Sequence, residues 1–178
     1  MPADRAVAAD YIRVTVIKTP LGDMVAGATG DAVCLLEFAD RGRLERQSKT
    51  VRELLGMPLL PGEHKLFAVL REQFAQYFEG NRAAFDIPLA YPGTAFQRKV
   101  WKALQTISYG QTMSYGEVAQ AIGKPGAARA VGGANGSNRI AIIIPCHRVI
   151  AAGGGPGGYG GGLWRKLRLL ELERSGGR

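Results

Sequence analysis

Three residues with reactive or charged side chains, Cys146, His147 and Arg148, follow the apolar run 140–145. A thiolate is the reactive form of cysteine. An unperturbed thiol has a pKa of about 8.5 and needs a base or a nearby positive charge. The β-branched run predicts a buried strand that ends at the cysteine. Neighbouring side chains of an extended chain point to opposite sides, so His147 reaches the sulfur only through a turn at Pro145 or through a water molecule.

A carboxylate near the C-terminus is a candidate partner for this histidine. Glu173 lies in the last turn of a predicted helix, where the helix dipole disfavours a negative charge unless a cation or imidazole offsets it. It can therefore orient His147 in a Cys–His–acid relay. The alternative for Cys146 is a small buried core residue, which is our interpretation of Cys34. The two cysteines and two histidines, including His64, lack zinc-ligand spacing, and we expect no metal.

Composition describes a globular chain of 178 residues, 46% hydrophobic and 21% charged. No apolar run approaches the roughly 20 residues of a membrane helix, and the first residues lack a secretory pattern. We expect a cytoplasmic protein with reduced thiols and no membrane association.

The net charge of +8 is distributed unevenly between the two halves of the chain. Residues 1–93 hold 11 Lys/Arg and 12 Asp/Glu, whereas residues 94–178 hold 12 and 3. This asymmetry favours nucleic acid as the partner of the C-terminal half.

The N-terminal half alternates between strand-like and helix-like patterns. Residues 11–38 predict a β-meander, because period-2 alternation is interrupted by two turns. Residues 41–56 are typical of a helix that frays, and residues 65–79 of an amphipathic helix. Residues 85–90 predict an edge strand, since Pro88 cannot donate to a sheet.

The stretch YPGT, at residues 91–94, is the predicted boundary between an N-terminal domain, residues 1–92, and a C-terminal domain, residues 93–178. Thr94 can cap the first helix of the second domain. The segment from Ser114 to Glu117 fits a capping box and opens another short helix.

A second short helix is predicted to start at Pro125, after a tight turn at Gly123. Its side chains are small, apart from Arg129 and Asn135. Two short helices with such a turn suggest a helix-turn-helix. The small residues serve either close helix packing or close approach to DNA, and the pattern alone does not decide. The glycine-rich stretch 153–162 lacks both phosphate-binding fingerprints, and we expect a loop that wraps an active site.

Beyond these patterns, IPCHRVI at residues 144–150 resembles the active-site signature of the O6-alkylguanine-DNA alkyltransferases. The stretch GTAFQRKVWKALQTISYGQTMSYGEVAQAIGKP resembles the family's lead-in helix and helix-turn-helix. AARAVGGAN resembles its recognition helix, and GYGGGLWRKLRLLELE its closing loop and helix. The resemblance spans residues 93–174, whereas residues 1–92 match only in general pattern.

The resemblance implies an α+β fold with two parts. The first is a small N-terminal α/β domain of ribonuclease H-like type with an antiparallel sheet. The second is a mostly helical C-terminal domain whose helix-turn-helix is of winged-helix type. It implies DNA repair by one irreversible transfer of the alkyl group from O6-alkylguanine, and from O4-alkylthymine, in duplex DNA to Cys146. The nucleotide is flipped through the minor groove. We expect a monomer without a cofactor.

Catalytic roles implied by the resemblance fall on Cys146, His147, Glu173, Asn138 and Tyr115. Cys146 is the alkyl acceptor, His147 the base that acts through a water, and Glu173 its orienting carboxylate. Asn138 stiffens the helix-turn-helix beside the strand. Tyr115 crowds the target phosphate and donates to guanine N3, which offsets charge on the leaving base.

Further positions are implied for binding. The DNA contacts are Tyr115, Ala128, Arg129, Ala130 and Asn135, with Arg129 as the finger that fills the gap in the base stack.

The substrate pocket is implied at Ala141, Val149, Tyr159 and Gly160. The carbonyls of Cys146 and Val149 accept from the exocyclic amine of guanine, and the Gly160 amide donates toward O6. Some family members have serine at the position of Gly160 and proline at that of Ala141. We therefore expect a looser pocket, and the resemblance leaves the preference between methyl and bulkier alkyl groups open.

Three other functions remain open on the residues alone: a lesion-binding relative without transfer, a regulatory helix-turn-helix with an incidental thiol, and a Cys–His hydrolase. Lesion-binding relatives lack the cysteine that is present here at position 146. A hydrolase leaves the basic, small-residue helix unexplained.

Overall fold

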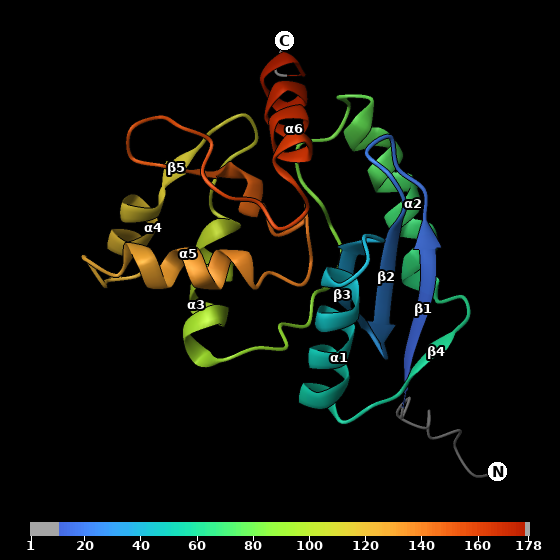
Figure 1. Cartoon of the computed structure of the whole chain (residues 1–178). Helices are drawn as coiled ribbons and strands as arrows, with labels where there is room; N and C mark the ends of the chain where they lie inside the picture. Colours follow the sequence, from blue (N-terminus) through green and yellow to red (C-terminus); the bar gives the residue numbers. More distant parts are fainter. Residues whose placement is uncertain (1–10, 177–178) are drawn as a thin grey trace, which may run out of the picture.

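A four-stranded sheet forms the N-terminal part of the computed structural model, which describes residues 11–176 (Figure 1). Its strands are β1 (Ile12–Ile17), β2 (Met24–Thr29), β3 (Ala32–Phe38) and β4 (Leu59–Pro61), in the order β3-β2-β1-β4. β2 pairs antiparallel with both β1 and β3, and the short β4 runs parallel to β1. The predicted β-meander is confirmed.

Two helices pack on this sheet: α1 (Arg43–Leu55) and α2 (Lys65–Phe78). α2 buries Leu66, Phe67, Leu70 and Phe74 in a cluster that includes Ala26 and Leu36 of the sheet. α1 buries Val51 in a separate cluster with Ile12 and Leu35. The helices therefore cover opposite faces. The helix predicted within 41–56 is confirmed: α1 has 13 residues, and its C-cap, Gly56, is left-handed. The expected fraying stays a prediction.

The edge strand predicted at 85–90 is reduced to one bridge, between Val33 and Leu89. The Val33 amide donates to Pro88 O at 2.9 Å, and the Ala90 amide donates to Val33 O at 2.9 Å. Pro88 has no amide hydrogen, so the ladder does not extend through it.

The C-terminal part is mostly helical. It contains α3 (Ala95–Leu104), α4 (Tyr115–Ala121), α5 (Ala128–Gly136) and α6 (Leu163–Ser175), with a parallel pair of two-residue strands, β5 (Met113–Ser114) and β6 (Val149–Ile150). The predicted caps are confirmed. Thr94 and Ser114 each form a capping box, with Gln97 and Glu117 respectively. The fold is thus α+β, with a small antiparallel-rich sheet and a helical part.

α4 and α5 form the predicted pair of short helices, but α5 begins at Ala128 rather than at Pro125. Gly126 has φ 87° and therefore cannot lie within a right-handed helix. α3 packs against α5, and Trp101 Nε1 donates to Ala134 O at 2.8 Å. α5 also packs against α4, and Figure 1 shows it between α3 and α4.

The strand predicted to end at Cys146 is wrong. Ile140 forms a single bridge with Leu36 of β3, and the chain then turns at Ile142, a non-glycine residue with φ 71°. Cys146 opens a 3-10 turn, η1 (Cys146–Arg148). A short apolar run does not distinguish a strand from a buried turn. Asn138 stabilises the turn because its amide donates to Ile144 O at 2.8 Å.

Buried side chains of both parts belong to one cluster, in which Phe38 and Leu70 occur together with Trp101 and Leu169. α6 lies at the junction of the two parts (Figure 1), and Arg165 Nε donates to Leu21 O at 2.8 Å. The boundary at 91–94 stays a prediction. Within residues 11–176, no helix combines the length and apolarity needed to cross a membrane.

Candidate active site

Cys146 lines a cavity of about 140 Å³ between α5, the glycine-rich loop and the end of β3. The residue is 5% exposed. The other lining residues are Glu37, Arg43, Tyr115, Gly132, Asn135, Gly136, Ala141, Gly158, Tyr159, Gly160 and Gly161. The structure thus brings Tyr115, Ala141, Tyr159 and Gly160 together around the thiol.

The Cys146 thiol is held by one side chain. Asn138 Nδ2 donates to Sγ at 3.1 Å, and the Asn138 side chain is fully buried. Burial raises the pKa of Cys146 to about 11, although the Asn138 hydrogen bond opposes this effect. At neutral pH the resting residue is a thiol, so a reaction at sulfur requires a base.

His147 is the adjacent base, and it is fully buried. Its Nε2 lies 2.8 Å from Glu173 Oε1. Since a carboxylate only accepts, we assign the proton to Nε2, which leaves Nδ1 as a basic lone pair. Nδ1 has no partner among residues 11–176. Burial, the largest effect, lowers the pKa of His147 although Glu173 opposes it, which favours the neutral imidazole.

Glu173 accepts hydrogen bonds from three residues besides His147. Arg148 donates through Nε and Nη2, each at 2.9 Å; Tyr77 Oη donates at 2.7 Å and the Gly110 amide at 3.2 Å. Burial raises the pKa of Glu173, but hydrogen bonds from His147 and Arg148 outweigh burial and hold that pKa well below its usual range. The predicted need of Glu173 for a cation or imidazole is met by Arg148 and His147. Tyr77 carries no sequence signal for this contact, because it lies 96 residues away.

The proposed DNA contacts do not all lie on one surface. Arg129 and Ala130 are exposed and Ala128 is half-buried at the start of α5, while Tyr115 opens α4. Asn135 is 5% exposed and lines the Cys146 cavity. Asn135 faces inward because it shares the buried face of α5 with Val131 and Ala134, and its expected role as a DNA contact stays a prediction.

The pocket is not looser at Gly160. A Cβ built on Gly160 would lie 2.2 Å from Cζ of Arg43, so the Arg43 guanidinium occupies that space. Arg43 Nε pairs with Glu37 at 2.8 Å, Nη1 donates to Gly136 O at 3.0 Å, and Nη2 donates to Asn138 O at 3.2 Å. Sequence reasoning missed Arg43 and Glu37, which come from the N-terminal part.

Val149 is the pocket residue that the structure places elsewhere. It is fully buried and does not line the cavity. Its carbonyl accepts from Lys166 Nζ, which also donates to Gly158 O at 3.1 Å. Burial lowers the pKa of Lys166 to about 8.

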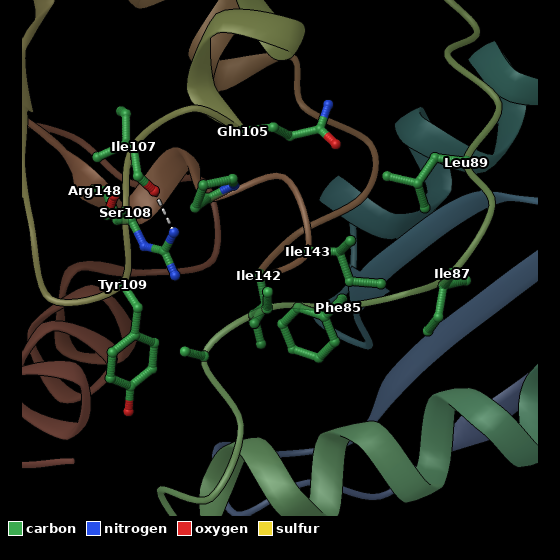
Figure 2. A pocket seen from close by; sticks show the side chains of 13 residues that line it. Phe85, Ile87, Leu89, Gln105, Ile107, Ser108, Tyr109, Ile142, Ile143 and Arg148 are labelled. Carbon is green, nitrogen blue, oxygen red and sulfur yellow. Dashed lines mark hydrogen bonds between the residues drawn. The ribbon is translucent and has the colours of Figure 1, made fainter. Parts of the chain in front are cut away.

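A larger cavity, of about 530 Å³, lies on another side of the turn at Ile142 (Figure 2). Most of its wall is apolar, and Arg148 is its one charged lining residue in the described chain. Arg148 is already engaged by Glu173 and by Ile107 O, at 2.5 Å (Figure 2). Neither a cysteine nor a histidine of the described chain lines this cavity, so we assign the chemistry to the smaller one. Within residues 11–176, no cluster of His, Cys, Asp and Glu could hold a metal ion.

The fold and the site define a mostly helical module that holds a buried cysteine at the wall of a small cavity. Residues 95–175 match the family model described as the DNA-binding domain of 6-O-methylguanine DNA methyltransferase. A methylated-DNA–protein-cysteine methyltransferase of Mycobacterium leprae is 47% identical over 158 residues, which cover 89% of this chain and 90% of that protein.

Two further relatives come from Mycobacterium tuberculosis. A methylated-DNA–protein-cysteine methyltransferase is 62% identical over 104 residues, which cover 58% of this chain and 63% of that protein. The crystal structure of an OGT in complex with DNA superposes with a TM-score of 0.79 at 44% identity, over 93% of this chain and 94% of that one. The chain belongs to the methylated-DNA–protein-cysteine methyltransferase family.

Proposed function

We propose that the protein repairs DNA by moving the alkyl group of O6-alkylguanine in duplex DNA onto Cys146, once per molecule. The observation that carries this proposal is the Cys146 sulfur at the wall of a cavity beside α5, with a buried His147–Glu173 pair that begins at the next residue of the chain. A family relative crystallised with DNA supports DNA as the partner.

The proposed reaction is one displacement at carbon. His147 Nδ1 takes the thiol proton through a water as the sulfur attacks the alkyl carbon. The new S–C bond forms while the C–O6 bond breaks, and the guanine leaves with that electron pair. Tyr115 donates to guanine N3, which offsets the negative charge on the base. The product thioether is stable, so no second cycle follows.

Delivery of the base requires that it leave the stack. We propose that α5 lies in the minor groove, that Arg129 fills the gap in the stack, and that the nucleotide rotates past Tyr115. The exposure of Arg129 and Ala130 on α5 supports this arrangement. O4-alkylthymine as a second substrate, a monomeric state and a cytoplasmic location remain predictions.

Two finer points of fold belong to the same proposal. The order β3-β2-β1-β4, with only β4 parallel to its neighbour, supports a ribonuclease H-like N-terminal domain of residues 1–92. The parallel β5–β6 pair beside α4 and α5 supports a helix-turn-helix of winged-helix type within residues 93–178.

The test is the stoichiometry of methyl transfer from a duplex carrying labelled O6-methylguanine. We expect one label per wild-type molecule at saturation, one for Cys34→Ala, and none for Cys146→Ala, which still binds the duplex. Cys34 is the matched control because it is also a buried thiol. Catalytic turnover, or labelling of Cys146→Ala, would contradict the proposal.

A further inference from the structure

Tyr77 is a buried tyrosine of α2 whose hydroxyl the proposed reaction leaves without a role. Its ring lies among aromatic side chains, with its centroid 5.2 Å from that of Phe85 and 6.0 Å from that of Tyr109. The residue is fully buried. A phenylalanine would fill nearly the same volume, so packing accounts for the ring but not for the hydroxyl. A buried hydroxyl needs a hydrogen-bond partner.

The partner of this hydroxyl is the carboxylate that orients the proposed base. Tyr77 Oη donates to Glu173 Oε1 at 2.7 Å, although the two residues are 96 positions apart in the chain. The same oxygen accepts from His147 Nε2 at 2.8 Å and from Arg148 Nη2 at 2.9 Å. A carboxylate oxygen has two lone pairs, so three donors compete for them. Tyr77 therefore shares the acceptor that holds the His147 proton.

The surroundings keep Tyr77 a donor and make the Glu173 contact decisive for the imidazole. Burial and the charge of Glu173 raise the pKa of Tyr77 well above its usual range, so the hydroxyl retains its proton. Burial lowers the pKa of His147, and the positive charges of Arg148 and Lys166 lower it further, whereas Glu173 raises it. A donor that weakens the hold of Glu173 on the Nε2 proton therefore favours the neutral imidazole.

We propose that Tyr77 is a positioning residue of the Cys–His–acid relay: its hydroxyl shares Glu173 Oε1 with His147 and so limits the pull of the carboxylate on the imidazole proton. This inference rests on the proposed function, in which the neutral imidazole takes the thiol proton. Without the hydroxyl, the negative charge of Glu173 is shared among fewer donors, and the His147–Glu173 hydrogen bond strengthens. The imidazole then becomes protonated at higher pH, and a protonated imidazole cannot accept the thiol proton. The N-terminal half of the chain thus takes part in the reaction through α2.

The experiment observes the His147 imidazole by NMR in the wild-type protein and in Tyr77→Phe. The chain has two histidines. His64→Asn retains a capping side chain at the start of α2 and assigns the remaining signal to His147. In Tyr77→Phe we expect the proton on His147 Nε2 to resonate further downfield, because its hydrogen bond is stronger. The acid limb of the pH–rate profile for single-turnover transfer should move to higher pH by about half a unit, the scale of one neutral hydrogen bond.

Tyr109→Phe is the matched control. Tyr109 lies beside the same network, but its hydroxyl donates to Leu172 O at 3.4 Å. Its removal should therefore leave the His147 signal and the acid limb as in wild type. Burial raises the pKa of Tyr109 and that of Cys146, so neither group titrates along the acid limb.

A second variant covers the case in which Tyr77→Phe does not fold. Replacement of Tyr77 by 3-fluorotyrosine tests the same hydrogen bond with the opposite sign. The fluorinated hydroxyl is more acidic and donates more strongly to Glu173, so the Nε2 proton of His147 should move upfield.

An Nε2 proton that stays in place in folded Tyr77→Phe, or in the fluorotyrosine protein, would overturn the inference, because the hydroxyl would then only attach α6 to α2. An equal shift in Tyr109→Phe would overturn it too, as would an acid limb that does not move in Tyr77→Phe. Absence of transfer by the wild-type protein at every pH would instead refute the proposed function, and the NMR comparison would still test the effect of Tyr77 on the imidazole.

Discussion

At the scale of single residues, the site keeps its nucleophile protonated and its base neutral. Burial raises the pKa of Cys146 to about 11, while burial lowers the pKa of His147. Neither residue carries a charge at rest, so neither exposes an unpaired charge to the core. The charge is concentrated on Glu173 and Arg148, which neutralise one another. At neutral pH the resting thiol therefore keeps its proton.

This arrangement predicts a loss of stability in alkali. In the unfolded chain the Cys146 thiol ionises near its ordinary pKa of about 8.5, whereas the folded thiol keeps its proton to about 11. A raised folded pKa adds stability below the unfolded pKa, and this is lost as pH rises between the two values. We expect Cys146→Ala to lose less stability than wild type between pH 9 and 11, by about 1–3 kcal/mol, in urea unfolding under reducing conditions. Cys34 is present in both proteins. Parallel stability curves would show that the native state does not hold the Cys146 proton.

Gly160 provides a second residue-scale prediction. Because Arg43 occupies the space of a side chain at Gly160, Gly160→Ser should displace the guanidinium from Glu37. We expect the free energy of unfolding to fall by about 1–3 kcal/mol, the range for an overpacked site.

The matched control introduces Gly160→Ser into a protein that already carries Arg43→Ala. Without the Arg43 guanidinium, the serine side chain has room. In that background the cost should shrink, and a double-mutant cycle in urea unfolding measures the difference. If the serine costs the same with and without Arg43, the guanidinium does not fill that space.

At the scale of elements, the capping signals predicted the starts of two helices correctly. The apolar run 140–145 predicted a strand where the structure has a turn. The capping boxes at Thr94 and Ser114 are visible in the sequence because each hydrogen bond closes within three residues. The active-site turn is not visible, because it depends on contacts across the fold. Leu36 of β3 accepts the Ala141 amide and donates to Arg139 O, both at 2.8 Å, which docks the turn on the sheet edge.

The site residues also divide into those that the sequence reveals and those that only contacts across the fold reveal. Cys146, His147 and Glu173 could be found from chemistry and from family resemblance. Tyr77, Glu37 and Arg43 could not, since they reach the site from the other half of the chain. Asn135 was visible as a polar residue on a helix of small ones, but only the packing of α5 shows which way it faces.

α5 also carries an element-scale prediction. Arg129 is exposed near the start of α5, where it can replace the extruded base in the stack. Arg129→Ala should slow transfer from a duplex by about tenfold, within the range for losing one stacking group, and leave transfer from the free base nearly unchanged. The assay compares the two substrates in single-turnover kinetics. Arg46→Ala removes an exposed arginine of α1 as a control. Equal slowing on both substrates would exclude the stack-filling role.

At the scale of the whole molecule, the two parts share one core around the active-site turn. That core includes Cys146 itself, together with Phe38 and Leu169. A bulkier group on sulfur must therefore be accommodated by packing that involves both parts. Protein interiors are close-packed, so added atoms displace neighbours.

The methylated protein should consequently be less stable than the unmodified one, by about 1–3 kcal/mol. For a chain of this size we expect the Tm to fall by a few degrees in thermal unfolding of the same preparation before and after reaction. Cys146→Ala treated with the same duplex should show no change. An unaltered Tm after complete methylation would mean that the cavity accepts the group without strain.

The central claim is that the Cys146 sulfur receives the alkyl group from a base extruded beside α5. The most direct measurement is the mass of every cysteine peptide after incubation with a duplex containing O6-methylguanine. The account predicts one added methyl in place of a proton on the peptide that contains Cys146, and an unchanged peptide around Cys34. A methyl on any other residue, or a repaired duplex with an unmodified Cys146 peptide, would contradict it.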